Sequence, residues 1–99
     1  MEDFVYYNNL YDIYGDLLTE NEQNCFIDYY QDNLSLSEIA ENKNVSRSAI
    51  GKTIKNVTDK LKYYEDTLHI LKKNEELSRI LLSNDIEELK KEINRIIEE

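Results

Sequence analysis

Six residues near the middle of the chain have types and spacing suited to binding phosphate groups. They are Ser46, Arg47, Ser48, Gly51, Lys52 and Lys55. Arginine can hold a phosphate or a guanine edge through two parallel hydrogen bonds, and lysine supplies a point charge. A serine at a helix start adds hydroxyl and backbone donors. We therefore take these residues as candidate nucleic-acid contacts, Arg47 being the best candidate for a base or bidentate phosphate contact. The alternative is that they are solvated residues of an exposed helix face.

The segment from Ser35 to Ile54, SLSEIAENKNVSRSAIGKTI, predicts the elements that would position these side chains. A capping box formed by Ser35 and Glu38 starts a short helix over residues 36–42. Ser46 can cap a second helix that begins at the next residue. The sequence therefore predicts two helices joined by a tight turn.

The turn between the two helices has residues that fit it. Asn44 tolerates the positive φ that a tight turn needs, and Ala40 is small where two helices must approach closely. Val45, Ala49 and Ile50 are expected to seat the second helix on the first. This is the layout of a helix-turn-helix, whose second helix offers its first residues to the major groove. Such folds also serve as protein-interaction modules.

Apolar residues recur at helical spacing along nearly the whole chain, whereas two Gly and no Pro leave few turns for β-hairpins. Further helices are expected over residues 3–18 and 20–32, the second starting at a capping box of Thr19 and Glu22. The expected fold class is therefore all-α, with a sigma region-four-like and winged-helix-like domain of three or four helices without strands. This helix-turn-helix domain is assigned to residues 1–64.

A C-terminal helical extension is assigned to residues 65–99. We expect a break near Tyr64-Glu65-Asp66, because ordinary helices rarely exceed about 25 residues. A further capping box is expected at Asn84 and Glu87. The apolar residues on 68–82 and 86–97 exceed what so small a chain easily covers by itself. The extension is therefore predicted to be a dimerisation or interaction arm.

The net charge of -9 is unevenly distributed along the sequence. Residues 1–45 carry ten acids and one base, residues 46–73 carry seven bases and three acids, and residues 74–99 carry eight acids and four bases. Arg47, Lys52, Lys55, Lys60 and Lys62 could form a basic stripe, although not all can share one face. About five phosphate contacts would make binding sensitive to salt. Alternatively, the acidic flanks maintain solubility and pair with the basic stretch.

Other chemistry finds little support in the sequence. Cys25 and His69 are the only Cys and His, and they lie far apart without a catalytic motif around either. Neither a Gly-rich phosphate loop nor a metal-ligand cluster is present, so we expect no enzyme activity, metal or cofactor. The start MEDFVYYNN resembles no signal peptide, and no apolar run approaches the roughly 18 residues of a membrane span. A cytoplasmic protein without membrane insertion is expected.

The segment from Leu18 to Leu61 resembles the DNA-binding region four of bacterial sigma factors. The matching patterns are L-T-x-x-E, S-x-x-E-I-A and V-S-x-S-A-I. More closely, residues 8–73 resemble the small YlxM-type helix-turn-helix proteins, through NNLYDIYGDLLTENEQ, DYYQ, DNLSLSEIAE, VSRSAI and KLKYYEDTLHILKK. That resemblance implies a regulatory or accessory role in the signal recognition particle pathway. Gly51 departs from what such a helix needs, since it is a poor helix former and offers no contact side chain.

Two functions remain open from the sequence. The first is a regulator that binds nucleic acid, either DNA or signal recognition particle RNA, with protein components of the particle as further partners. The second is a helical adaptor that docks on a translocation-pathway GTPase without touching nucleic acid. A homodimer would present two candidate helices and so double the phosphate contacts of one chain.

Overall fold

A computed structural model describes residues 3–82 and 85–98, and this part of the chain contains α-helices but no β-strand. The fold is all-α, as expected. The chain divides into two compact units, with the division between Thr67 and Leu68. The α-helices are α1 (Phe4–Tyr14), α2 (Glu20–Phe26), α3 (Leu36–Lys43), α4 (Arg47–Leu68), α5 (Ile70–Ile80) and α6 (Ile86–Glu98).

The helix starts follow the predicted caps. Thr19 and Glu22 form a complete capping box at α2, and Ser35 and Glu38 form another at α3. The Ala49 N–H donates to Ser46 Oγ at 3.1 Å, which confirms the single cap of α4. The predicted cap Asn84 lies outside the described residues. Within them, the Glu87 and Glu88 N–H groups donate to Asp85 Oδ1, so that carboxylate caps α6.

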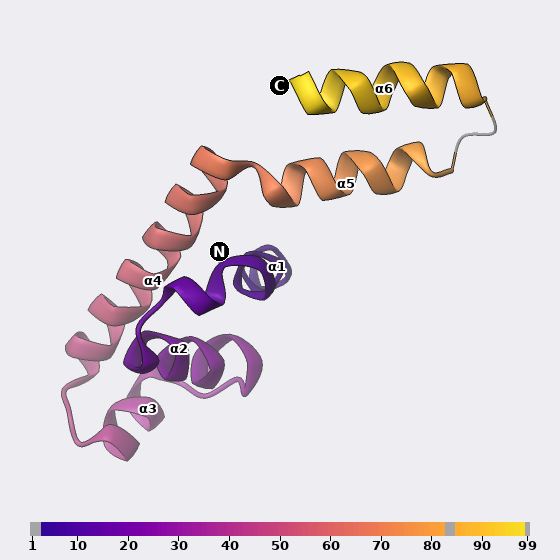
Figure 1. Cartoon of the computed structure of the whole chain (residues 1–99). Coiled ribbons are helices and arrows are strands. Elements are labelled where there is room, and N and C mark those ends of the chain that lie inside the picture. The colour runs from indigo at the N-terminus through magenta and orange to yellow at the C-terminus, as the bar shows by residue number, and fades with distance from the viewer. Residues whose placement is uncertain (1–2, 83–84, 99) are drawn as a thin grey trace. The chain divides into compact units, whose positions relative to one another are not determined.

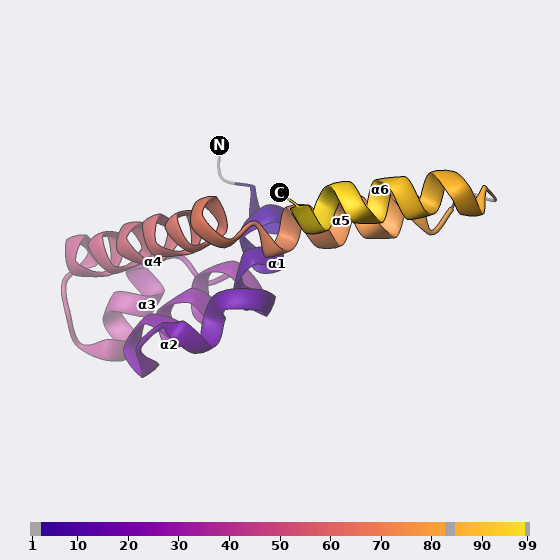
Figure 2. The same cartoon turned by 45° about the horizontal axis from the view of Figure 1, so that its top comes forward.

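In the first unit, α1, α2 and α3 gather along one side of the long helix α4 (Figures 1 and 2). The face of α4 that meets them buries an apolar stripe at a spacing of three and four residues. This stripe consists of Ile50, Ile54, Val57 and Leu61. The other helices fill the core opposite it with Leu10, Tyr14, Leu18, Cys25, Phe26, Tyr30, Ile39 and Ala40.

Aromatic rings occupy much of the space between α1 and α2. Tyr11 stacks on Phe26 with centroids 4.4 Å apart and an interplanar angle of 4°. Phe26 in turn stacks on Tyr30 at 4.6 Å. Such pairs add to the free energy gained by burying the rings. The buried Cys25 fits the same core, and burial raises the pKa of its thiol.

The first helix is shorter than the predicted 3–18. It ends at Tyr14, and Gly15–Leu17 form a 3-10 turn closed by the Leu18 N–H donating to the Gly15 carbonyl. The tighter turn changes the direction of the following side chains. Leu17 is therefore 57% exposed, although it is a large apolar residue. Gly15 also permits a close approach, because a Cβ there would lie 3.0 Å from the Tyr11 ring.

The second predicted helix is interrupted rather than continuous. α2 ends at Phe26, and the chain continues as a π-helical turn, Ile27–Gln31. The last hydrogen bond of this turn runs from the Asp32 N–H to the Ile27 carbonyl. Asn33 then adopts a φ of 58° and ends the segment. The polar residues after Tyr30 thus stop the helix, because asparagine tolerates this conformation.

The expected break near residues 64–66 lies elsewhere. α4 continues to Leu68, and the interruption is His69, with a φ of 56°. Glu65 is 8% exposed and accepts a hydrogen bond from the Tyr14 hydroxyl, so this stretch of α4 belongs to the packed first unit. The usual length of helices therefore predicted that this helix is interrupted, but not at which residue.

The second unit is an antiparallel pair of helices, α5 and α6, which lie side by side in both views (Figures 1 and 2). Ile80 and Ile96 are buried. Arg95 on α6 donates to Glu92 Oε2 at 2.9 Å and lies 3.9 Å from Glu76 Oε2 on α5. Several other aliphatic side chains of this pair stay exposed, as expected from the sequence.

Candidate nucleic-acid interface

The turn between α3 and α4 has the backbone geometry that the sequence predicts. Asn44 adopts φ 56° and ψ 45°, in the left-handed region. The N–H of Val45 donates to the Ala40 carbonyl at 3.0 Å, which satisfies one of the last carbonyls of α3. Ser46 then caps α4. Three residues thus separate the two helices, which form a helix-turn-helix.

Five of the six candidate residues are exposed on the first turns of α4. These are Ser46, Arg47, Ser48, Lys52 and Lys55. Gly51 is half-buried instead, and a Cβ built there would lie 4.0 Å from Leu36 Cδ1 of α3. Gly51 therefore lies at the edge of the candidate face, toward α3, which limits what it could contribute to a contact.

Val45 was expected to help seat α4, but it is 48% exposed. Its place at the end of the turn leaves the side chain at the rim of the interface between the helices. Ile50, also expected to seat α4, is only 3% exposed, and Ile39 of α3 is fully buried. Of the residues expected to seat α4, Ile50 is therefore in the core, whereas Val45 is not.

Ion pairs reduce the basic stripe expected from the sequence. Lys55 Nζ lies 2.9 Å from Asp59 Oδ2 in an exposed i,i+4 pair. Lys60 pairs with Glu22, and Lys62 lies over the Tyr7 ring, 5.6 Å from its centroid. Within residues 3–82 and 85–98, Arg47 and Lys52 have no acidic partner.

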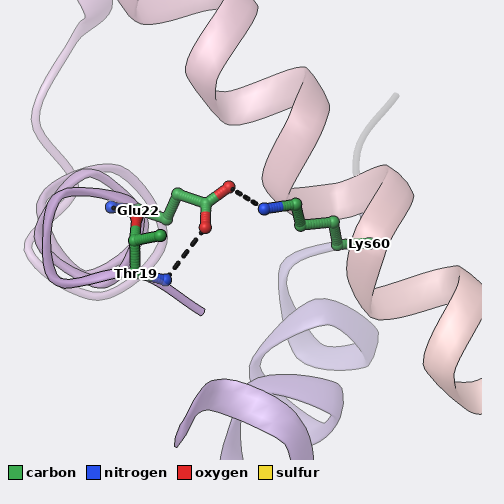
Figure 3. Close-up of polar contacts among 3 residues, drawn as sticks. All are labelled: Thr19, Glu22 and Lys60. Carbon is green, nitrogen blue, oxygen red and sulfur yellow. Dashed lines mark hydrogen bonds and ion pairs between the residues drawn. The ribbon is translucent and has the colours of Figure 1, made fainter. Parts of the chain in front are cut away.

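Glu22 links the start of α2 to the middle of α4 (Figure 3). Its Oε1 accepts from the Thr19 N–H at 2.9 Å, and its Oε2 accepts from Lys60 Nζ at 2.7 Å. Burial by itself raises the pKa of Glu22, but the hydrogen bonds from Lys60 and Thr19 outweigh it and leave the pKa below its ordinary value. The hydrogen bond to Glu22 raises the pKa of Lys60. Lys60 thus serves the packing of α4 on α2.

One basic residue near the interface was missed by the sequence analysis. Lys43, in the last turn of α3, is half-buried and has no ion pair within the described part of the chain. It lines a hollow together with Ala49 and Thr53 of α4. The signal that could have found it is its position as the only base among residues 1–45, directly before the turn.

Comparison with known proteins agrees with this architecture. The profile of the family described as "UPF0122: Putative helix-turn-helix protein, YlxM / p13 like" matches residues 1–99. The chain belongs to this family. A UPF0122 protein of Fusobacterium nucleatum is 37% identical over 98 residues, which cover 99% of this chain and 95% of the relative. A UPF0122 protein of Thermoanaerobacter is 34% identical over 97 residues, covering 98% of this chain and 79% of the relative.

The residues matched by the family include those of α5 and α6 as well as those of the helix-turn-helix. None of the described helices is long and apolar enough to cross a membrane. The described residues also contain no group of three or more His, Cys, Asp or Glu side chains placed to hold a metal ion.

Proposed function

We propose that this UPF0122 protein binds nucleic acid through the first turns of α4. Arg47 and Lys52 would make the principal contacts, with Ser46, Ser48 and Lys55 beside them. The observation that carries the proposal is the pair of exposed cations, Arg47 and Lys52, on a helix whose residues 46–58 include no acid. In a helix-turn-helix, these turns are the ones that enter the major groove.

The ion pairs lower the number of phosphates that one chain can neutralise. Arg47 and Lys52 are available, Lys55 would have to leave Asp59, and Lys60 is held by Glu22. Two or three contacts predict a slope of about -2 to -3 when the logarithm of the binding constant is plotted against that of the salt concentration. A single chain would therefore bind weakly, and a dimer with two such helices would bind more tightly.

The experiment is a salt-dependent titration against duplex DNA and against signal recognition particle RNA. The wild type is compared with an Arg47→Ala, Lys52→Ala double variant. The control is a Lys90→Ala, Lys91→Ala variant, which removes two exposed lysines from α6. We expect the first variant to weaken binding and flatten the slope by about 2, and the control to change neither. Equal weakening by both variants, or no wild-type binding at low salt, would contradict the proposal.

We further infer an accessory or regulatory role in the signal recognition particle pathway, as a cytoplasmic binding protein rather than an enzyme. Its support is the similarity to the YlxM-type proteins. A pull-down of the particle's RNA and GTPase from extract should recover the RNA with the wild type but not with the Arg47, Lys52 variant. Recovery of the GTPase from nuclease-treated extract, by either protein, would instead support an adaptor that needs no nucleic acid.

The second unit supports a homodimer. Its helices expose large aliphatic side chains over fractions from 37% to 84%. These are Leu77, Leu81, Leu82, Ile86, Ile93 and Ile97. Contiguous apolar patches of more than a few hundred Å² are rare on monomers and mark interfaces. In a two-fold symmetric dimer, α5 and α6 of a second copy would cover these residues. The dimer would then carry two α4 helices.

A further inference from the structure

A groove lies beside the candidate interface, between α2, the α3–α4 turn and the first turns of α4. Its walls include three apolar residues, Val45, Ala49 and Ile50. Its polar groups come from three other residues, Asn21, Lys43 and Thr53. Ile50 is 3% exposed and so forms part of the floor, whereas Val45 is 48% exposed at the edge. The groove thus combines an apolar floor and walls with a few polar groups.

The polar groups of this groove are mostly hydrogen-bond donors without partners. Among the residues that the structure describes, Lys43 forms no ion pair and the Asn21 side chain forms no hydrogen bond. The Thr53 hydroxyl donates to the Ala49 carbonyl at 3.1 Å. Of the two acids that flank Asn21 on α2, Glu22 is already paired with Lys60, and Glu20 is exposed to solvent. An ammonium and an amide N–H are therefore available to a ligand that offers negative oxygens.

The groove and the candidate interface involve the same first turns of α4. Ala49 and Thr53 follow Ser48 and Lys52 directly in the helix, and successive helical residues project about 100° apart. The two sets of side chains therefore occupy neighbouring faces of the same turns. A polyanion that reaches Arg47 and Lys52 would pass beside the groove and Lys43.

We propose that this groove seats the sugar-phosphate backbone of one strand of the bound nucleic acid. Lys43 binds a phosphate, the Asn21 amide donates to the same or the next phosphate, and the sugar lies against Val45 and Ala49. The chemistry fits because phosphates offer only acceptors and the sugar carries apolar C–H faces. The inference rests on the proposed function and extends it: contacts from α2 and α3 join those of α4, so the strand is held from both sides of the turn.

The test is the salt-dependent titration with three single variants of the full-length protein. Lys43→Gln removes the charge but keeps a long side chain, and Lys43→Arg restores the charge. Lys62→Gln is the matched control, because Lys62 lies over Tyr7 on a distant turn of α4. We expect Lys43→Gln to weaken binding about three- to tenfold and to lower the magnitude of the salt slope by about 1. Lys43→Arg and Lys62→Gln should keep the wild-type slope, and circular dichroism should show equal helicity in all proteins.

Every other outcome contradicts the proposal that the groove seats the nucleic-acid backbone. If Lys43→Gln keeps the slope while the Arg47, Lys52 double variant loses affinity, the strand does not enter the groove and the proposed function stands. If Lys43→Gln and Lys62→Gln lower the slope equally, the effect is one of total charge. If polyglutamate displaces the nucleic acid and its own binding requires Lys43, the occupant is an acidic protein segment. Absence of wild-type binding overturns both proposals.

Discussion

Tyr14 on α1 donates a hydrogen bond to Glu65 near the end of α4, with 2.7 Å between Oη and Oε1. The two residues are 51 positions apart, and they are only 1% and 8% exposed. A buried polar pair of this kind is costly to break, because the remaining group cannot turn to water. The pair therefore joins the first helix of the domain to the last turns of the helix that carries the candidate interface.

Removing the Tyr14 hydroxyl should destabilise the first unit. Tyr14→Phe keeps the ring in the core but removes the donor to Glu65, so we expect a loss of about 1 to 3 kcal/mol in the free energy of unfolding. Urea denaturation followed by circular dichroism measures it. Tyr63→Phe is the matched control, since Tyr63 is 67% exposed, and it should change stability by less than about 0.5 kcal/mol. Equal losses in the two variants would show that the buried hydrogen bond contributes little.

The contacts of Glu22 predict a second stability effect. Glu22→Gln weakens the capping box at Thr19 and removes the charge that holds Lys60. It should therefore lower the free energy of unfolding by about 1 to 2 kcal/mol near neutral pH. Glu20→Gln is the control: it neutralises a carboxylate in the same first turn whose side chain is exposed. Glu20→Gln should lower the free energy of unfolding by less than half as much as Glu22→Gln. A larger loss for Glu20→Gln would mean that the interaction of the carboxylates with the helix dipole outweighs the contacts of Glu22.

The pH dependence of the Glu22→Gln effect follows from the lowered pKa of Glu22. A carboxyl group whose pKa is lower in the folded protein contributes stability above its ordinary pKa of 4.5, and this contribution is lost as the pH falls through the folded value. The stabilities of the wild type and of Glu22→Gln should therefore differ most at neutral pH and become similar in acid. Thermal unfolding between pH 7 and pH 3 measures the difference, and a gap that stays constant would contradict the assigned role of the charge.

The local features of the fold could be predicted from sequence, because each depends on residues within one helical turn. The caps at Thr19, Ser35 and Ser46 and the positive φ of Asn44 are of this kind. The long-range features could not. Sequence spacing placed Lys60 among the candidate cations, but its partner Glu22 is 38 residues away.

The same limit applies to the edges of the candidate site. Exposure of Val45 and partial burial of Gly51 depend on how α4 sits against α3, which a single helical pattern does not determine. Lys43 was missed because it belongs to the helix before the turn, and only the fold brings its side chain beside Ala49 and Thr53.

Asn44 gives a prediction about the turn itself. Its left-handed conformation costs a residue with a Cβ about 1 kcal/mol, which asparagine reduces and glycine avoids. Asn44→Gly should therefore leave the stability within about 0.5 kcal/mol of wild type, whereas Asn44→Val should lose more than about 1 kcal/mol. Chemical denaturation of both variants checks the order. A valine variant as stable as the glycine variant would mean that the turn adopts another conformation in solution.

The homodimer proposed for the second unit predicts a mass twice the 11.8 kDa of one chain. Leu81→Ser with Leu82→Ser should shift the protein toward monomer, because these side chains, 80% and 84% exposed, would lose the apolar contacts of the partner copy. The control is Val5→Ser with Leu17→Ser, which changes two exposed apolar residues of the first unit and should leave the mass unchanged. Light scattering across micromolar concentrations measures the mass. A wild-type protein that stays monomeric at the highest concentration would rule out self-association and leave these leucines for a different partner.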